Sequence, residues 1–145
     1  MIKITTPPRT LYPQLINLWE ASVRATHDFL DEGDILYFRQ RILDEYFDLV
    51  DLYIATDEHE KLLGFLGLSP NKIEMLFIDP IFRNKGVGKQ LAQYAIKQHQ
   101  ATSVDVNEQN PEAVGFYQKL GFKIVNRQPI DAEGKPFPIL VMQFI

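Results

Sequence analysis

The chain has 145 residues, of which 46% are hydrophobic and 23% charged, and its formal net charge is −4 at pH 7. This length and composition fit one globular domain over residues 1–145 and exclude a disordered or repetitive chain. The acidic balance argues against a nucleic-acid partner, which needs a basic surface. Because the chain has no cysteine, it can form no disulfide, thiolate metal site or acyl-cysteine, and we expect no metal cofactor.

The sequence also argues against a membrane partner. Its longest apolar run, residues 62–68, is seven residues long and includes two glycines, whereas a membrane-spanning helix needs about 20 residues. Residues 1–5 show no basic start followed by an apolar stretch, which a secretion signal would have. We therefore expect a cytoplasmic protein.

In the first half of the chain, apolar residues change from helical to strand-like spacing near residue 51. The predicted elements of this half are a strand over 2–5, a helix over 13–26, an acidic loop over 28–34, a helix over 34–49, and strands over 52–56, 62–68 and 73–78. Short polar turns separate the last three strands, which favours an antiparallel meander.

The second half predicts two helices, each followed by strands. The elements are a helix that begins near Gly86, a strand over 102–106, a helix over 110–120, and strands over 122–130 and 138–144. Asn110 and Pro111 are typical of a helix start, and Gly121 of a helix end. The fold class is therefore mixed α+β, with about seven strands in a mostly antiparallel sheet, about four helices, and one parallel step across the Gly86 helix.

A glycine-containing turn over 83–89 joins a predicted strand to the next helix. Free amides at a helix N-terminus, glycines that allow close approach and three basic side chains together predict an anion site. The spacing does not fit a P-loop, because Gly88-Lys89 lacks the earlier glycine and the following Ser or Thr. It does not fit a dinucleotide-binding turn either, because residue 91 is leucine. Another class of phosphate-binding turn remains, with a solvated glycine turn as the alternative.

Two segments resemble the signatures of the GCN5-related N-acetyltransferase (GNAT) family. Residues 73–88, which read Ile-Glu-Met-Leu-Phe-Ile-Asp-Pro-Ile-Phe-Arg-Asn-Lys-Gly-Val-Gly, resemble its acetyl-CoA signature. Its second signature is similar to residues 107–122, with Asn107, Asn110-Pro111, Ala113, Phe116-Tyr117 and Gly121-Phe122. The order of elements also matches the fold of the family, and residues 22–30 resemble a subgroup of small bacterial members.

The resemblance implies transfer of an acetyl group from acetyl-CoA to an amine. It implies that the strands at 73–78 and 102–106 splay apart, so that the pantetheine amides pair with a free strand edge. The residues expected to contact acetyl-CoA are Leu76, Phe77, Ile78, Arg83, Asn84, Lys85, Gly86, Val87, Gly88, Lys89, Asn110, Phe116 and Tyr117. Asn110 has an equally good alternative role as a helix cap.

The resemblance also suggests how the protons move. Glu74, a carboxylate in the cofactor strand, is the expected base, with His27 and water as alternatives. Tyr117 is the expected acid toward the coenzyme A thiolate, because a phenol is protonated at neutral pH. Since no cysteine can carry the acetyl group, we expect direct attack in a ternary complex.

The acceptor amine is not determined by the sequence. Residues 28–51 carry eight acidic and two basic side chains, which suits either a solvated face or a funnel for a cationic amine. His27 and Phe29 are the expected acceptor contacts. The alternatives for the amine are a small molecule, an antibiotic, a peptide N-terminus and a lysine, and the chain is expected as a monomer or a homodimer. A non-catalytic acyl-CoA sensor on the same fold is the alternative function.

Overall fold

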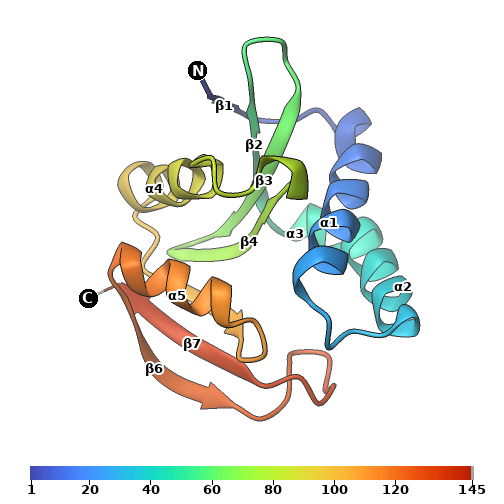
Figure 1. The fold of residues 1–145 in the computed structure, drawn as a ribbon, viewed down its shortest axis with the longest axis vertical. Coiled ribbons are helices and arrows are strands. Elements are labelled where there is room, and N and C mark those ends of the chain that lie inside the picture. Colours follow the sequence, from blue (N-terminus) through green and yellow to red (C-terminus); the bar gives the residue numbers. More distant parts are fainter. Residues whose placement is uncertain (145) are drawn as a thin grey trace.

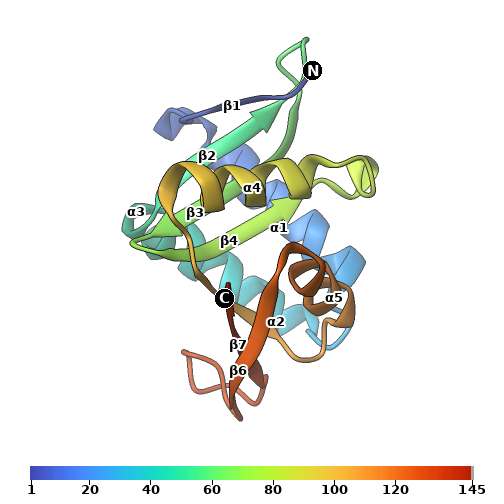
Figure 2. The ribbon, with the colours of Figure 1, turned by 90° about the vertical axis from the view of Figure 1, so that its left-hand side faces the viewer.

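A computed structural model describes residues 1–144 of the chain. Within these residues, seven strands form one sheet in the order β1-β2-β3-β4-β5-β7-β6, and helices cover both of its faces (Figures 1 and 2). The strands are β1 (Lys3–Thr5), β2 (Asp51–Thr56), β3 (Leu62–Ser69), β4 (Lys72–Ile78), β5 (Ser103–Asn107), β6 (Phe122–Gln128) and β7 (Ile139–Phe144). The helices are α1 (Tyr12–Thr26), α2 (Glu32–Arg41), α3 (Phe47–Leu49), α4 (Val87–His99) and α5 (Pro111–Leu120). The predicted fold class is confirmed.

The second predicted helix, over 34–49, is a continuous helical segment that begins earlier than expected. Asp34 N–H donates to Asp31 Oδ1 at 2.8 Å, and Asp31 N–H donates to Asp34 Oδ2 at 3.1 Å. This reciprocal capping begins α2 at Glu32, so that the predicted acidic loop over 28–34 is shorter than the sequence suggested. One π-helical turn, η2 (Ile42–Tyr46), connects α2 with α3, and apolar periodicity does not reveal it.

The strands β2, β3 and β4 form the antiparallel meander that the sequence predicts. The chain then crosses through α4 to β5, which pairs with β4 in parallel, as expected. The last hairpin is not added in chain order, because β7 lies between β5 and β6. β6 ends at Gln128, before the predicted strand end at residue 130.

The short parallel pairing of β4 with β5 positions the site. Within the described chain, this pairing involves only Lys72 and Ile73 of β4, although the strand runs on to Ile78. β5 continues instead along β7. From residue 74 onward, the edge of β4 that faces β5 is therefore free to pair with another extended group.

Helices lie on both faces of the sheet (Figure 2), and an apolar core lies between each group of helices and the sheet. One core packs α4 and α5 on the sheet and includes Leu91 and Phe122, both nearly inaccessible to solvent. The other packs α1 and the α2–α3 segment and includes Leu15 and Phe47. In residues 1–144, every helix is too short or too polar to cross a lipid bilayer.

Candidate active site

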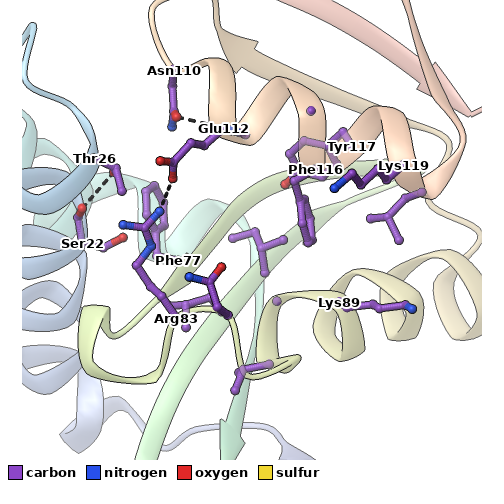
Figure 3. Close-up of a pocket in the computed structure, with 18 of the residues that line it drawn as sticks. Ser22, Thr26, Phe77, Arg83, Lys89, Asn110, Glu112, Phe116, Tyr117 and Lys119 are labelled. Atoms are coloured by element: carbon purple, nitrogen blue, oxygen red, sulfur yellow. Dashed lines mark hydrogen bonds and ion pairs between the residues drawn. The ribbon is translucent and has the colours of Figure 1, made fainter.

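A cavity of about 960 Å³ opens beside the free edge of β4 (Figure 3). Its walls come from β4, the turn before α4, the first turn of α4, one side of α5 and the end of α1. The expected acetyl-CoA contacts in its lining are Leu76, Phe77, Ile78, Arg83, Asn84, Gly86, Val87, Gly88, Lys89, Asn110, Phe116 and Tyr117. Lys85 belongs to the same turn but does not line the cavity.

The turn before α4 has the backbone geometry of an anion site. Gly86 is the N-cap of α4 with a φ of 85°, a left-handed conformation in which other residues are strained. At Gly88, a Cβ atom would lie 3.5 Å from Ile78 and 3.6 Å from Phe116, so that a side chain there would occupy the cavity. The amides of the first turn of α4, together with Lys89, offer this end of the cavity to a phosphate group.

An ion pair joins the turn before α4 to the start of α5 across this cavity. Figure 3 shows the Arg83 guanidinium directed at the Glu112 carboxylate, to which it is hydrogen-bonded. Asn110 Oδ1 accepts a hydrogen bond from Ala113 N–H at 3.3 Å, so Asn110 caps α5 as well as lining the cavity. The cap begins α5 where the sequence predicted it.

A smaller cavity of about 100 Å³ lies where β4 and β5 diverge, with Glu74 and Asp105 in its wall. Several residues line both cavities, and we call them the junction residues. They are His27, Leu76, Phe77, Asn110, Ala113 and Tyr117. Two molecules, one in each cavity, would therefore meet at these side chains.

Tyr117 is the buried phenol of the junction, with 6% of its surface exposed. Its ring packs edge-on against Phe116 and Phe122, with centroids 5.0 and 5.5 Å apart. Burial raises the pKa of the hydroxyl above its ordinary value, and no group in residues 1–144 is hydrogen-bonded to it. The hydroxyl is thus protonated at neutral pH and free to donate a hydrogen bond into the cavities.

Glu74 is the extra residue of a β-bulge, because the pairing of β4 with β3 skips it. Bulges of this kind re-aim a side chain and occur often beside active sites. The Glu74 carboxylate accepts a hydrogen bond from Ser69 Oγ at 2.7 Å and lies 3.7 Å from Lys72 Nζ. Lys72 also donates to Asp105 Oδ2 at 2.8 Å. One lysine therefore forms ion pairs with both carboxylates that line the smaller cavity.

His27 follows the last residue of α1 and lines both cavities. Burial lowers the pKa of its imidazole to about 4, although the charge of Asp28 acts in the opposite direction. Phe29, the other expected acceptor contact, lines neither cavity. Its ring packs between those of His27 and Phe137, at centroid distances of 5.3 and 5.6 Å.

The sequence analysis did not identify one residue that lines the cavity and one set of contacts elsewhere in the fold. Lys119 lines the larger cavity three residues after Phe116, a spacing that places both on one side of α5. Hydrogen bonds of Glu133 connect the loop between β6 and β7 to α2 and η2. The Glu133 carboxylate accepts one from Arg41 Nε at 2.8 Å and another from the Tyr46 hydroxyl. These partners lie 92 and 87 residues away from Glu133 along the chain, so no local pattern indicates them.

Four of the eight acidic residues in the segment over 28–51 form ion pairs within the protein, among them Asp34 with Lys135. Asp31 and Asp34 cap α2, as described above. Other members pair with arginines: Glu32 with Arg24, Glu45 with Arg41, and Asp48 with Arg9. These contacts favour the interpretation of this segment as a solvated, internally paired face.

The diverging strands, the glycine turn and the cavity beside them suit an extended ligand that carries a phosphate group, as an acyl-CoA-dependent transferase requires. Residues 24–142 match the family model described as "Acetyltransferase (GNAT) domain". The chain is 39% identical over 127 residues to the peptidyl-lysine N-acetyltransferase YjaB of Salmonella typhimurium, covering 88% of this chain and 87% of that protein. The chain belongs to the GNAT family of acetyltransferases, whose members use acetyl-CoA. The resemblance seen in residues 73–88 and 107–122 is thereby confirmed.

Solved structures agree with this assignment. The solution structure of apo YjaB from Escherichia coli has a TM-score of 0.90 at 36% identity, covering 100% of this chain and 98% of that one. A PaiA N-acetyltransferase from Thermoplasma acidophilum, solved in complex with coenzyme A, shares the fold with a TM-score of 0.74 at 21% identity, covering 99% of each chain.

Proposed function

We propose that the protein transfers an acetyl group from acetyl-CoA directly to the ε-amino group of a lysine in a peptide or protein. The observation that carries the proposal is the junction, where the larger and the smaller cavity share lining residues beside the free edge of β4. The YjaB proteins to which the chain is similar are named as peptidyl-lysine N-acetyltransferases, which supports lysine as the acceptor. In this proposal the whole chain acts as one N-acetyltransferase domain.

The larger cavity suits acetyl-CoA, which supplies the activated acetyl thioester. The free edge of β4 offers N–H and C=O groups to an extended amide chain. The N-terminus of α4 and Lys89 suit the pyrophosphate, and Gly88 leaves the space that a side chain would fill. Lys119 on α5 adds a second cation to the lining, whereas Arg83 is already paired with Glu112.

The smaller cavity suits the end of a lysine side chain. Glu74 and Asp105 supply negative charge for an ammonium group, offset in part by Lys72. In the proposed reaction Glu74 removes the first proton of the ammonium, because an amine attacks only when its lone pair is free. Tyr117 donates its hydroxyl proton to the sulfur as the C–S bond breaks.

The test is a coenzyme A release assay with matched acceptors. A peptide with a blocked N-terminus and a single lysine should support turnover, and the same peptide with arginine in that place should not. The other candidate acceptors are tested in the same assay with free amino acids, aminoglycosides and peptides that have free N-termini. Turnover with a small amine and none with lysine peptides would contradict the proposed acceptor. Binding of acetyl-CoA without transfer to any amine would instead indicate a sensor.

A further inference from the structure

Two hydrogen-bond contacts at the end of α1 favour one tautomer of the His27 imidazole. Thr26 Oγ1 donates to the Ser22 carbonyl oxygen at 2.9 Å, and Thr26 Oγ1 lies 2.7 Å from His27 Nδ1. A hydroxyl has one proton and a carbonyl oxygen only accepts, so the Thr26 proton is committed to Ser22. This arrangement favours His27 Nδ1–H as the donor of the short contact, and in a neutral imidazole this leaves the lone pair on Nε2.

Within residues 1–144, no donor is hydrogen-bonded to Nε2 of His27. The side chain lines both cavities at the junction. The Phe29 ring packs against the imidazole at a centroid distance of 5.3 Å, so the Nδ1 bond to Thr26 is supported by packing. These contacts fix the ring while leaving one nitrogen available to a ligand.

The imidazole is neutral at the pH at which the enzyme would work. Burial lowers the pKa of His27 to about 4, because the charged form loses hydration. Asp28, next in the chain, is the charge that acts on it directly. The negative charge of Asp28 raises the pKa of His27, but this effect is smaller than the lowering caused by burial. The other charged or titratable groups that line a cavity with His27 are Glu74 and Asp105 in the smaller cavity, Arg83, Lys89, Glu112 and Lys119 in the larger one, and Tyr117 in both.

We propose that His27 is a further catalytic residue, whose Nε2 accepts the second proton that the acceptor nitrogen loses. The inference rests on the proposed function and completes its proton balance. Glu74 takes the first proton from the ammonium group and passes it to water. As the C–N bond forms and the C–S bond breaks, the nitrogen becomes strongly acidic, so that even a weakly basic imidazole accepts its second proton. Tyr117 gives its hydroxyl proton to the departing sulfur, and the imidazolium proton restores that hydroxyl. One proton is released overall.

The first test reads the tautomer and needs no turnover. Long-range ¹H–¹⁵N NMR spectra of the free protein should show His27 protonated at Nδ1, with no titration between about pH 5.5 and 8. Thr26→Val keeps the shape of the side chain but removes the hydroxyl, and should give a mixture of tautomers. A wild-type spectrum with the proton on Nε2 would overturn the proposal, because that nitrogen would then have no lone pair to offer.

The second test compares His27→Gln with His59→Gln, a control at a side chain that is 83% exposed in the turn between β2 and β3. His27→Gln should lower kcat by about 10²-fold with both substrates saturating, and Thr26→Val by several-fold. Acetyl-CoA affinity measured by calorimetry should change less than about threefold in each, and His59→Gln should behave as wild type.

Full kcat in His27→Gln would refute the catalytic role. The comparison uses whichever amine supports turnover of the wild type. Inactivity with lysine peptides alone would contradict the proposed function and leave the role of His27 to be decided by the other amine and by the NMR spectrum.

Discussion

Replacing Tyr117 by phenylalanine separates chemistry from packing at the junction. The substitution removes one oxygen atom and keeps the ring that packs against Phe116 and Phe122. A buried neutral hydrogen bond would contribute about 0.5–1.5 kcal/mol to stability, but the Tyr117 hydroxyl is bonded to no group in residues 1–144. The free energy of unfolding should therefore change by less than about 0.5 kcal/mol.

The expected loss is in turnover. A thiolate is a moderately good leaving group, since an ordinary thiol has a pKa of about 8.5, and protonation of the sulfur then contributes toward the lower end of general acid catalysis. We expect kcat to fall by about ten- to a thousandfold, which corresponds to about 1.4–4 kcal/mol in the barrier. The affinity for acetyl-CoA should be almost unchanged, because the ring is retained.

The assay combines steady-state kinetics with calorimetry and thermal unfolding, and Tyr53→Phe on β2 is the matched control. Tyr53 packs against Tyr94 and His99, away from both cavities, so its hydroxyl should not affect turnover. If Tyr117→Phe keeps full activity with its best acceptor, the acid role is wrong, and the thiolate leaves without a protein donor.

Three further predictions address the other parts of the site. Glu74→Gln should lower turnover by about 10²–10⁴-fold at neutral pH and remove the acidic limb of the pH–rate profile, and a profile identical to that of the wild type would assign the first proton to water. Gly88→Asp should weaken acetyl-CoA binding by about tenfold to several thousandfold in calorimetry, because its side chain enters the cavity beside Ile78 and adds a negative charge; normal affinity in the folded variant would refute the phosphate assignment. The third prediction concerns stability against pH. The pKa of His27 is about 4 in the folded protein and about 6.5 when unfolded, so the unfolded chain binds more protons between these values. Stability should thus fall by about 1–3 kcal/mol as the pH is lowered through this window, allowing for partial exposure of the ring. Chemical denaturation of His27→Gln should lack this component.

Most of the residues that the sequence predicts for acetyl-CoA binding line one cavity, and their sequence signals are local. The glycine turn over 83–89 and the capped start of α5 at Asn110 are each encoded within a few residues, and both line the same cavity. The order of the last three strands in the sheet is harder to predict from the sequence, because the placement of β7 between β5 and β6 depends on contacts across the whole sheet. Lys85 was expected at the cavity for the same local reason as Lys89, but only Lys89 lines it.

The proposed acceptor side depends on the register between neighbouring strands and on contacts between distant segments. The bulge at Glu74 arises from the register of β3 with β4, and the hydrogen bonds of Glu133 come from residues far along the chain. The alternation of apolar residues does not show where a strand carries one extra residue, nor which distant polar side chains are hydrogen-bonded. The tautomer proposed for His27 rests on residues within one helical turn, yet the contacts that favour it are seen only in the atomic positions of Thr26 and Ser22.

Direct transfer of the acetyl group at the junction is tested most directly by mass spectrometry of both partners. The protein is mixed with acetyl-CoA, first alone and then with a blocked peptide that contains one lysine. We predict that the protein alone gains no acetyl group, and that the peptide gains one acetyl group on its lysine ε-nitrogen, at a rate reduced in Tyr117→Phe. Saturable binding of acetyl-CoA with an unmodified peptide, or an acetylated protein that forms before the product, would contradict the account.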